Sequence, residues 1–312
     1  MIPDILFKLT KTQQKAVISM AKMLNDIKWN TQQRLQHIEL MAYYTGIITR
    51  SDLARAFAIS DAAATKDLKL YNELAPDNLI YRHSVFGFVP SDNFQPQFSK
   101  LDPAAVLSII AANLAAAGGP YGDQPLYGIP TESLPLPARL PERAVLAQIL
   151  RAIKQGRKLA ASYHSLSDRE SPQKRVLEPH ALANTGRRWH LRAYNEETYD
   201  FRDFVLSRFT AAQMLPETAE SSAQYDDDWS EVVTLQLSPH PRLNAQKRAR
   251  LLIDYQNEGG LLEVPVRRAL IGYLLQHLAV DTTADHSMNP NAHPLIVLNR
   301  DEIEPFAGWA FA

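Results

Sequence analysis

The chain has 312 residues, of which 46% are hydrophobic and 21% are charged, and its formal net charge is −1. This composition is typical of globular proteins, and the length corresponds to two or three domains. The absence of cysteine excludes disulfides, thiolate metal sites and a cysteine nucleophile. No apolar run approaches the roughly 20 residues that span a bilayer, and the N-terminus lacks the pattern of a secretion signal. We therefore expect a cytoplasmic protein without a membrane partner.

Helical periodicity dominates the first part of the chain. Residues 31–44 place apolar side chains at spacings of three and four. Thr49 and Asp52 have the spacing of a capping box, and Ser60 can cap the helix that follows. Residues 78–90 carry β-branched and aromatic side chains on both sides of a polar pair, which predicts a hairpin. Helix, turn, helix and hairpin is the order of a winged helix-turn-helix.

The third of these helices has two chemically different faces. Ala64, Leu68 and Tyr71 fall on the apolar face. The opposite face is small, hydroxylic and cationic without a long acid, as a helix in the major groove of DNA requires. The candidate DNA contacts are Ser60, Ala62, Thr65, Lys66 and Lys69, with Arg82 and His83 at the hairpin tip. A three-helix packing unit with a solvated lysine face would give the same pattern.

Two stretches divide the rest of the chain. Residues 118–141 hold six prolines and four glycines, which predicts an extended connector. Before this connector, Asp102 and Pro103 open a further helix that is expected to end at Gly118. Residues 216–229 are polar and acidic, which predicts a second break.

Charge and periodicity differ on the two sides of the second break. Residues 139–210 carry a net charge of +6, whereas residues 211–312 carry −7. The middle part begins with a helix and continues with closely spaced strands, which predicts a small bent sheet or barrel that faces an anion. The last part alternates strands and helices, which predicts a small α/β layer.

One strand of the middle part concentrates polar groups. Alternation places Trp189, Leu191 and Ala193 on a core face and His190, Arg192 and Tyr194 on the other. Four arginines and two histidines on neighbouring strands could converge on a phosphate, because guanidinium binds phosphate in a bidentate manner. Surface arginines on separate faces are the alternative.

The same region resembles the WYL domain. The residues that carry the resemblance are Arg175, Pro179, Gly186, Trp189-His190-Leu191, Arg202, Phe204 and Arg208. His190 stands where the family has its namesake tyrosine, which makes the site pH-sensitive. With its flanks, the chain resembles WYL regulators of the BrxR/CapW type, which repress bacterial phage-defence (BREX/CBASS) systems.

The resemblance implies an α+β multidomain chain that acts as a homodimeric, ligand-sensing repressor on a double-stranded DNA operator. The expected parts are a winged helix-turn-helix at 1–95, a helix and connector at 96–141, an Sm-like β-barrel WYL domain at 142–215 and a C-terminal dimerisation domain at 230–312. A nucleotide or nucleic-acid effector is implied at the WYL domain, and no cofactor. The expected pocket residues are Tyr163, His164, Arg175, His190, Arg192, Arg202 and Arg208. We expect this arginine cluster to lack counter-charges of its own.

Two other functions remain open. An enzyme such as a nuclease is disfavoured, because the chain lacks phosphate-loop, zinc-protease and serine-hydrolase motifs. The acidic run at 226–228 is expected to be solvated instead of metal-binding, and we expect no catalytic residue. A nucleic-acid- or nucleotide-binding adaptor, in which the helix-turn-helix only dimerises, is the second alternative.

Overall fold

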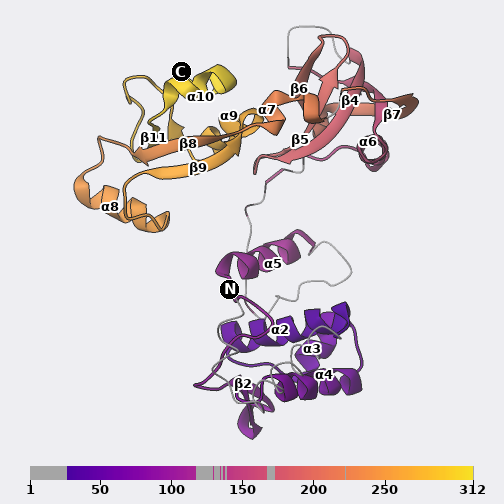
Figure 1. Ribbon diagram of the computed structural model, residues 1–312, viewed down its shortest axis with the longest axis vertical. Coiled ribbons are helices and arrows are strands. Elements are labelled where there is room, and N and C mark those ends of the chain that lie inside the picture. The colour runs from indigo at the N-terminus through magenta and orange to yellow at the C-terminus, as the bar shows by residue number, and fades with distance from the viewer. Residues whose placement is uncertain are drawn as a thin grey trace, which may run out of the picture. The chain divides into compact units, whose positions relative to one another are not determined.

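The computed structural model describes residues 27–116, 139–166, 173–221 and 223–311, with a few single residues between the first two ranges. The chain forms two compact units, Met1–Leu136 and Pro137–Ala312, which we describe separately (Figure 1). The start of the first domain at 1–26, the helix end at Gly118 and most of the connector at 118–141 lie outside the described residues.

Helices and a hairpin form the first unit, as the sequence predicts. The elements are α2 (Trp29–Thr45), α3 (Arg50–Phe57), α4 (Asp61–Leu74), β1 (Leu79–Arg82), a 3₁₀ turn (His83–Val85), β2 (Gly87–Pro90) and α5 (Pro103–Ala116). The predicted capping box is present, because the Thr49 hydroxyl accepts a hydrogen bond from the Asp52 amide at 3.1 Å and the Asp52 carboxylate accepts one from the Thr49 amide at 3.0 Å. The Ser60 hydroxyl accepts one from the Ala63 amide at 3.2 Å, so its predicted cap is confirmed too.

One carboxylate inside the first unit joins three of its segments. Glu39 of α2 is fully buried and accepts a hydrogen bond from the Tyr71 hydroxyl of α4 at 3.0 Å. It also accepts the backbone amides of Gln97, Phe98 and Ser99 at 2.6, 2.9 and 2.8 Å. A buried charge is stable only with such partners. The hydrogen bonds of Glu39 therefore connect α2 to α4 and to the segment that follows the hairpin.

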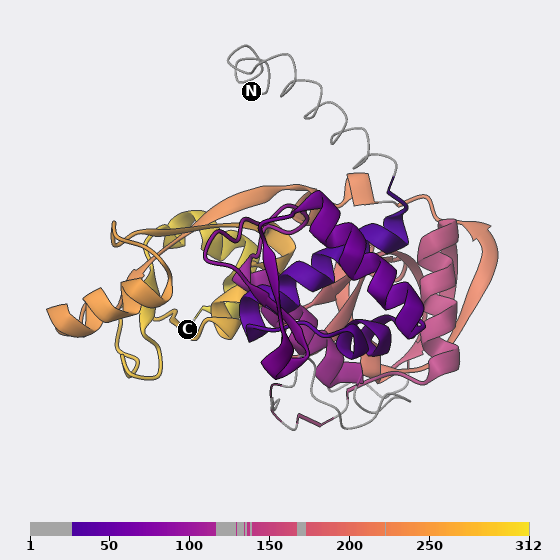
Figure 2. The ribbon, with the colours of Figure 1, turned by 90° about the horizontal axis from the view of Figure 1, so that it is seen from below.

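The second unit begins with a helix and a five-stranded antiparallel sheet. These elements are α6 (Arg143–Gln155), β3 (Arg157–Tyr163), β4 (Gln173–Asn184), β5 (Trp189–Asn195), β6 (Asp200–Val205) and β7 (Phe209–Thr218). The strand order is β6-β5-β4-β3-β7, and α6 packs against β7 and β3 (Figures 1 and 2). Within the described ranges no pairing joins the edge strands β6 and β7, so the expected closed barrel is not confirmed.

A smaller mixed sheet completes the second unit. Its elements are α7 (Asp227–Ser230), β8 (Val232–Pro239), α8 (Ala245–Asp254), β9 (Leu262–Arg267), α9 (Ile271–His277), β10 (Val280–Asp281), β11 (Leu295–Val297) and α10 (Arg300–Ala307). The strand order is β10-β11-β8-β9, and the predicted alternation of strands and helices is confirmed. Across the described part of the chain, no helix is both long and apolar enough to cross a membrane.

The Glu39 contacts predict a specific loss of stability. Glu39→Gln places an amide nitrogen, which cannot accept, among four donors, so we expect the free energy of unfolding to fall by about 2–4 kcal/mol. Glu73→Gln is the control, because Glu73 lies on the exposed face of α4, and it should change stability by less than about 0.5 kcal/mol. Urea unfolding of the full chain, followed by circular dichroism, measures both. Equal midpoints for Glu39→Gln and the unaltered chain would contradict this role.

Candidate nucleic-acid and effector sites

The two predicted faces of α4 are confirmed. Ala64, Leu68 and Tyr71 are at most 3% exposed and pack in the core of the first unit. The side chains on the opposite face, Ala62, Thr65, Lys66 and Lys69, are all exposed. The face is less purely cationic than expected, because Glu73, one turn beyond Lys69, lies 3.9 Å from its ammonium group. Lys66 makes no ion pair within the described residues, so its charge is free to meet a phosphate.

The hairpin presents aromatic as well as cationic side chains. Arg82 and His83 are exposed at its tip, as predicted. The sequence analysis did not single out Phe86, which is 78% exposed directly after the 3₁₀ turn. The sequence feature that could have indicated an exposed aromatic residue here is the pair of phenylalanines, Phe86 and Phe88, on either side of Gly87.

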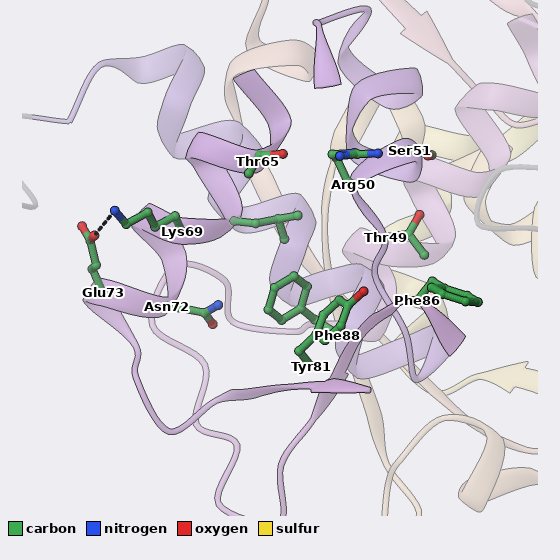
Figure 3. A pocket seen from close by; sticks show the side chains of 11 residues that line it. Thr49, Arg50, Ser51, Thr65, Lys69, Asn72, Glu73, Tyr81, Phe86 and Phe88 are labelled. Carbon is green, nitrogen blue, oxygen red and sulfur yellow. Dashed lines mark ion pairs between the residues drawn. The ribbon is translucent and has the colours of Figure 1, made fainter. Parts of the chain in front are cut away.

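A groove lies between α4, the first turn of α3 and the hairpin. Its volume is about 690 Å³, and Figure 3 shows the side chains that line it. Arg50 and Ser51 come from α3, Thr65 and Lys69 from α4, and Phe86 from the hairpin. Arg50 is paired with Asp61 at 3.3 Å, and both side chains are more than half exposed. Glu73 also lines the groove and pairs with Lys69, so a phosphate bound there would replace Asp61 and Glu73 as the exposed partners of the two cations.

The two faces of β5 separate core packing from polar contacts. Leu191 and Ala193 are fully buried in the core beneath α6, as predicted. Trp189, expected on the same face, is 41% exposed at the start of the strand. The opposite face, with His190 and Arg192, is not an open surface, because Asp226, the N-cap of α7, and Tyr273 of α9 lie against it.

Arg192 is bound by a carboxylate that follows the WYL sheet. Its Nε and Nη2 atoms donate to the two oxygens of Asp226 at 2.7 and 2.8 Å. His180 of β4 lies 2.9 Å from the same carboxylate, and Asp203 of β6 lies 3.5 Å from Arg192. Burial opposes the charge of Asp226, but hydrogen bonds from Arg192 and His180 outweigh it and lower its pKa to about 2. Asp226 is 1% exposed, so the expectation of a solvated acidic run is wrong for this residue.

His190 lies in a cationic environment at the boundary with the C-terminal layer. It is 1% exposed, and its ring centroid is 4.7 Å from that of Tyr273 on α9. Among the described residues, neither ring nitrogen has a hydrogen-bond partner. Burial and the positive charges of Arg188 and Arg208 lower the pKa of His190 to about 4. The imidazole is therefore neutral near pH 7, and the expected sensitivity in the neutral range does not hold for the ligand-free protein.

The remaining candidate residues make other contacts, and among them the His164 amide donates to the Arg208 carbonyl at 3.0 Å. Tyr163 packs in the core against Phe204 and Phe209, and its hydroxyl accepts the Val205 amide at 3.1 Å. His164 is partly exposed at the end of β3.

Acids of the same unit hold the other arginines. Arg175 lies 3.3 Å from Glu197, and Arg202 lies 2.8 Å from Asp200. Because Arg192 is bound by Asp226, the expectation of an arginine cluster without internal counter-charges is wrong. His190 and Arg208 are two expected pocket residues that lie near each other, because the 3₁₀ turn Leu206–Arg208 contacts β5 and the charge of Arg208 acts on the His190 imidazole.

Comparisons with known proteins agree with this architecture. Family models match residues 30–112 as the BrxR transcriptional regulator winged helix-turn-helix domain, 144–214 as the WYL domain and 232–303 as the BrxR C-terminal dimerization domain. A curated relative from Stenotrophomonas maltophilia, named DNA-binding transcriptional repressor CapW, is 32% identical over 89% of this chain and 92% of its own. The protein of the same name from Escherichia coli strain KTE188 is 33% identical over 88% and 91%. The chain belongs to the BrxR/CapW family of WYL-domain transcriptional regulators.

A solved structure adds little to this assignment. The proteasome accessory factor B/C (PafBC) of Arthrobacter aurescens matches at 18% identity over 90% of this chain and 48% of that chain, with a TM-score of 0.25. A score this low does not bear on the fold.

In this BrxR/CapW-family chain, the side of the WYL sheet that carries His190 and Arg192, here called the polar WYL face, meets four further residues that no sequence motif singles out: His180, Arg188, Asp226 and Tyr273. His180 and Arg188 lie beside strand positions that were identified, so the strand register could have found them. Asp226 had a local signal, because it caps α7 by accepting the Trp229 amide at 3.2 Å. Tyr273 had none, because its hydroxyl donates to Asp203, which lies 70 residues away in the chain, at 3.2 Å.

The Asp226 contact predicts a large effect from a small change. Asp226→Asn removes the bidentate counter-charge of buried Arg192. It leaves this side chain only the longer contacts to Asp203 and Asp228, at 3.5 and 3.8 Å, so we expect a loss of about 3 kcal/mol in the free energy of unfolding. Asp227→Asn changes the exposed neighbour and should cost less than about 0.5 kcal/mol. Urea unfolding monitored by tryptophan fluorescence compares the two variants. A similar cost for both would mean that the pair contributes little.

Proposed function

We propose that this chain is a DNA-binding transcriptional repressor that acts in the cytoplasm on a phage-defence operon. In this proposal a homodimer binds an inverted-repeat operator, and an anionic, nucleotide-type ligand at the WYL domain releases it. The observation that carries the proposal is the exposed, cationic and hydroxylic face of α4 beside a hairpin with a cationic tip. The names of the CapW relatives support the same reading.

Each half of the operator would be read by one α4 helix. Thr65 is short enough to reach base edges from the major groove, and Lys66 and Lys69 would neutralise phosphates. Arg82 and His83 would contact the backbone or the minor groove beyond. The C-terminal layer supports a dimer, because its family model is that of a dimerization domain. Its helix α8 also leaves Ile253 73% exposed, a side chain that a second copy could cover.

The ligand would bind around His190. An anionic oxygen there would pair with Arg188 and Arg208 and give the buried imidazole the partner that it lacks among the described residues. Tyr273 and Asp226 hold the C-terminal layer on the same face. A ligand that displaces these contacts would move this layer and, in a dimer, change the spacing of the two α4 helices. A coupling free energy of about 1–3 kcal/mol suffices for regulation.

Operator binding gives a direct test. We expect footprinting on the DNA upstream of the gene to reveal two half-sites related by a dyad and separated by whole turns of about 10–10.5 base pairs. Lys66→Ala should weaken binding to all sequences, because it removes a phosphate contact, whereas Thr65→Ala should alter preference at one base position. Protection without dyad symmetry would contradict the dimeric arrangement.

The effector site has its own test. Arg208→Ala should leave operator affinity within about twofold but abolish release by nucleotides or short oligonucleotides, because the ligand loses a charge partner. Arg202→Ala is the comparison, since Asp200 already holds that side chain at the sheet edge, and its release should be nearly normal. Fluorescence anisotropy of labelled operator, with and without the candidate ligands, measures both. Loss of operator binding by folded Arg208→Ala would mean that this surface contacts DNA and is not a sensor.

A further inference from the structure

The hairpin of the first unit places a bulky ring where the backbone favours glycine. Phe86 has a φ of +50°, in the left-handed region that strains a side chain of this size. The next residue, Gly87, is glycine for another reason, because a Cβ there would lie 3.0 Å from the Ile47 side chain and 3.1 Å from that of Thr49. Six other non-glycine residues of the described chain also have a φ of +50° to +56°, and Phe86 adopts this conformation as the cap of the 3₁₀ turn, where its amide donates to the His83 carbonyl. What distinguishes Phe86 is the place of its exposed ring.

The surroundings of Phe86 indicate what the ring contacts. The ring is 78% exposed and lies on the rim of the groove, across from Thr65 and Lys69 of α4 (Figure 3). Arg82 and His83 precede it on the exposed tip, and residues 79–90 contain no acid. An apolar ring among cations suits a polyanion that also offers an apolar surface.

We propose that Phe86 inserts into the DNA minor groove next to the major groove that α4 reads, and bends the operator there. This inference rests on the proposed operator binding. The groove beneath the ring would take the sugar–phosphate strand that separates the major and minor grooves of the DNA. Its phosphates would replace Glu73 and Asp61 as the partners of Lys69 and Arg50, whose present ion pairs are exposed. Apolar side chains that enter the minor groove partly unstack one base step. The operator should therefore carry a deformable pyrimidine–purine step at this position.

Glycine separates a DNA contact from a folding role. Phe86→Gly removes the ring and relieves the strained backbone, so the melting temperature should not fall. Operator affinity should fall about tenfold, and the bend, measured by energy transfer between dyes at the operator ends, should decrease. Phe86→Leu should keep most of the bend, because leucine can also act as a wedge.

Tyr199→Gly is the matched control. Tyr199 is 79% exposed with a φ of +56°, but it lies in the turn between β5 and β6 of the second unit. Its replacement should leave affinity and bend unchanged. Because the Phe86 contact is apolar, Phe86→Gly should keep the salt dependence of binding, whereas Arg82→Ala should reduce the slope of log K against log salt by about one.

The outcomes separate this inference from the proposed function. If the unaltered protein binds no operator, the proposed function fails first. If it binds, and Phe86→Gly binds and bends DNA equally, the inference is overturned. It is also overturned if affinity falls without a change in bend, or if sedimentation shows that Phe86→Gly alters dimerisation, since the ring would then contact a second copy.

Discussion

The organisation of the second unit depends on where the carboxylate of Asp226 lies. The residue belongs to the link between the WYL sheet and the C-terminal layer, yet it is buried against Arg192 and His180 of the sheet. Its backbone continues directly into α7 and β8. A bidentate pair in a buried place is sensitive to the loss of either partner. One contact thus fixes where the C-terminal layer starts relative to the WYL sheet.

Because of this contact, part of the polar WYL face is occupied within the chain and is not available to a ligand. The sequence pattern of arginines and histidines predicts an open anion pocket. In the structure, Arg192 instead binds Asp226 and so connects the WYL sheet to the start of the C-terminal layer. His190 is the part of the face that keeps unpartnered polar atoms, because neither of its ring nitrogens has a hydrogen-bond partner in the described chain and the charges of Arg188 and Arg208 act on it. Tyr273 of the C-terminal layer lies against His190. In the proposed function, a ligand at this point would touch both layers, which would couple its binding to their rearrangement.

Local chemistry explains which features were predictable. The caps at Thr49 and Ser60, and the two faces of α4, follow from interactions within a few residues, and the structure has them as predicted. The start of β7 is not visible in the sequence, because the 3₁₀ turn Leu206–Arg208 that precedes it contains no glycine or proline.

The long-range contacts were not predictable in the same way. Alternation assigned His190 and Arg192 correctly to one face of β5, but it could not show that Asp226 and Tyr273 cover that face. Those residues lie 34 and 83 positions further along the chain, and nothing in their local pattern names a partner. The sequence could therefore predict which polar residues share this face of the sheet, but not which charged residues form pairs there.

The proposed function makes the contact of Asp226 with Arg192 and His180 the element through which a ligand would alter how the dimer holds DNA. The most direct measurement is the operator affinity of Asp226→Asn, at a temperature where circular dichroism and sedimentation show a folded dimer, without any ligand. If the proposed ligand acts by loosening the contact between Asp226 and Arg192, Asp226→Asn should have the same effect without ligand. The account therefore predicts that this variant binds the operator at least about fivefold more weakly than the unaltered protein. Unchanged operator affinity in a folded, dimeric Asp226→Asn would contradict it.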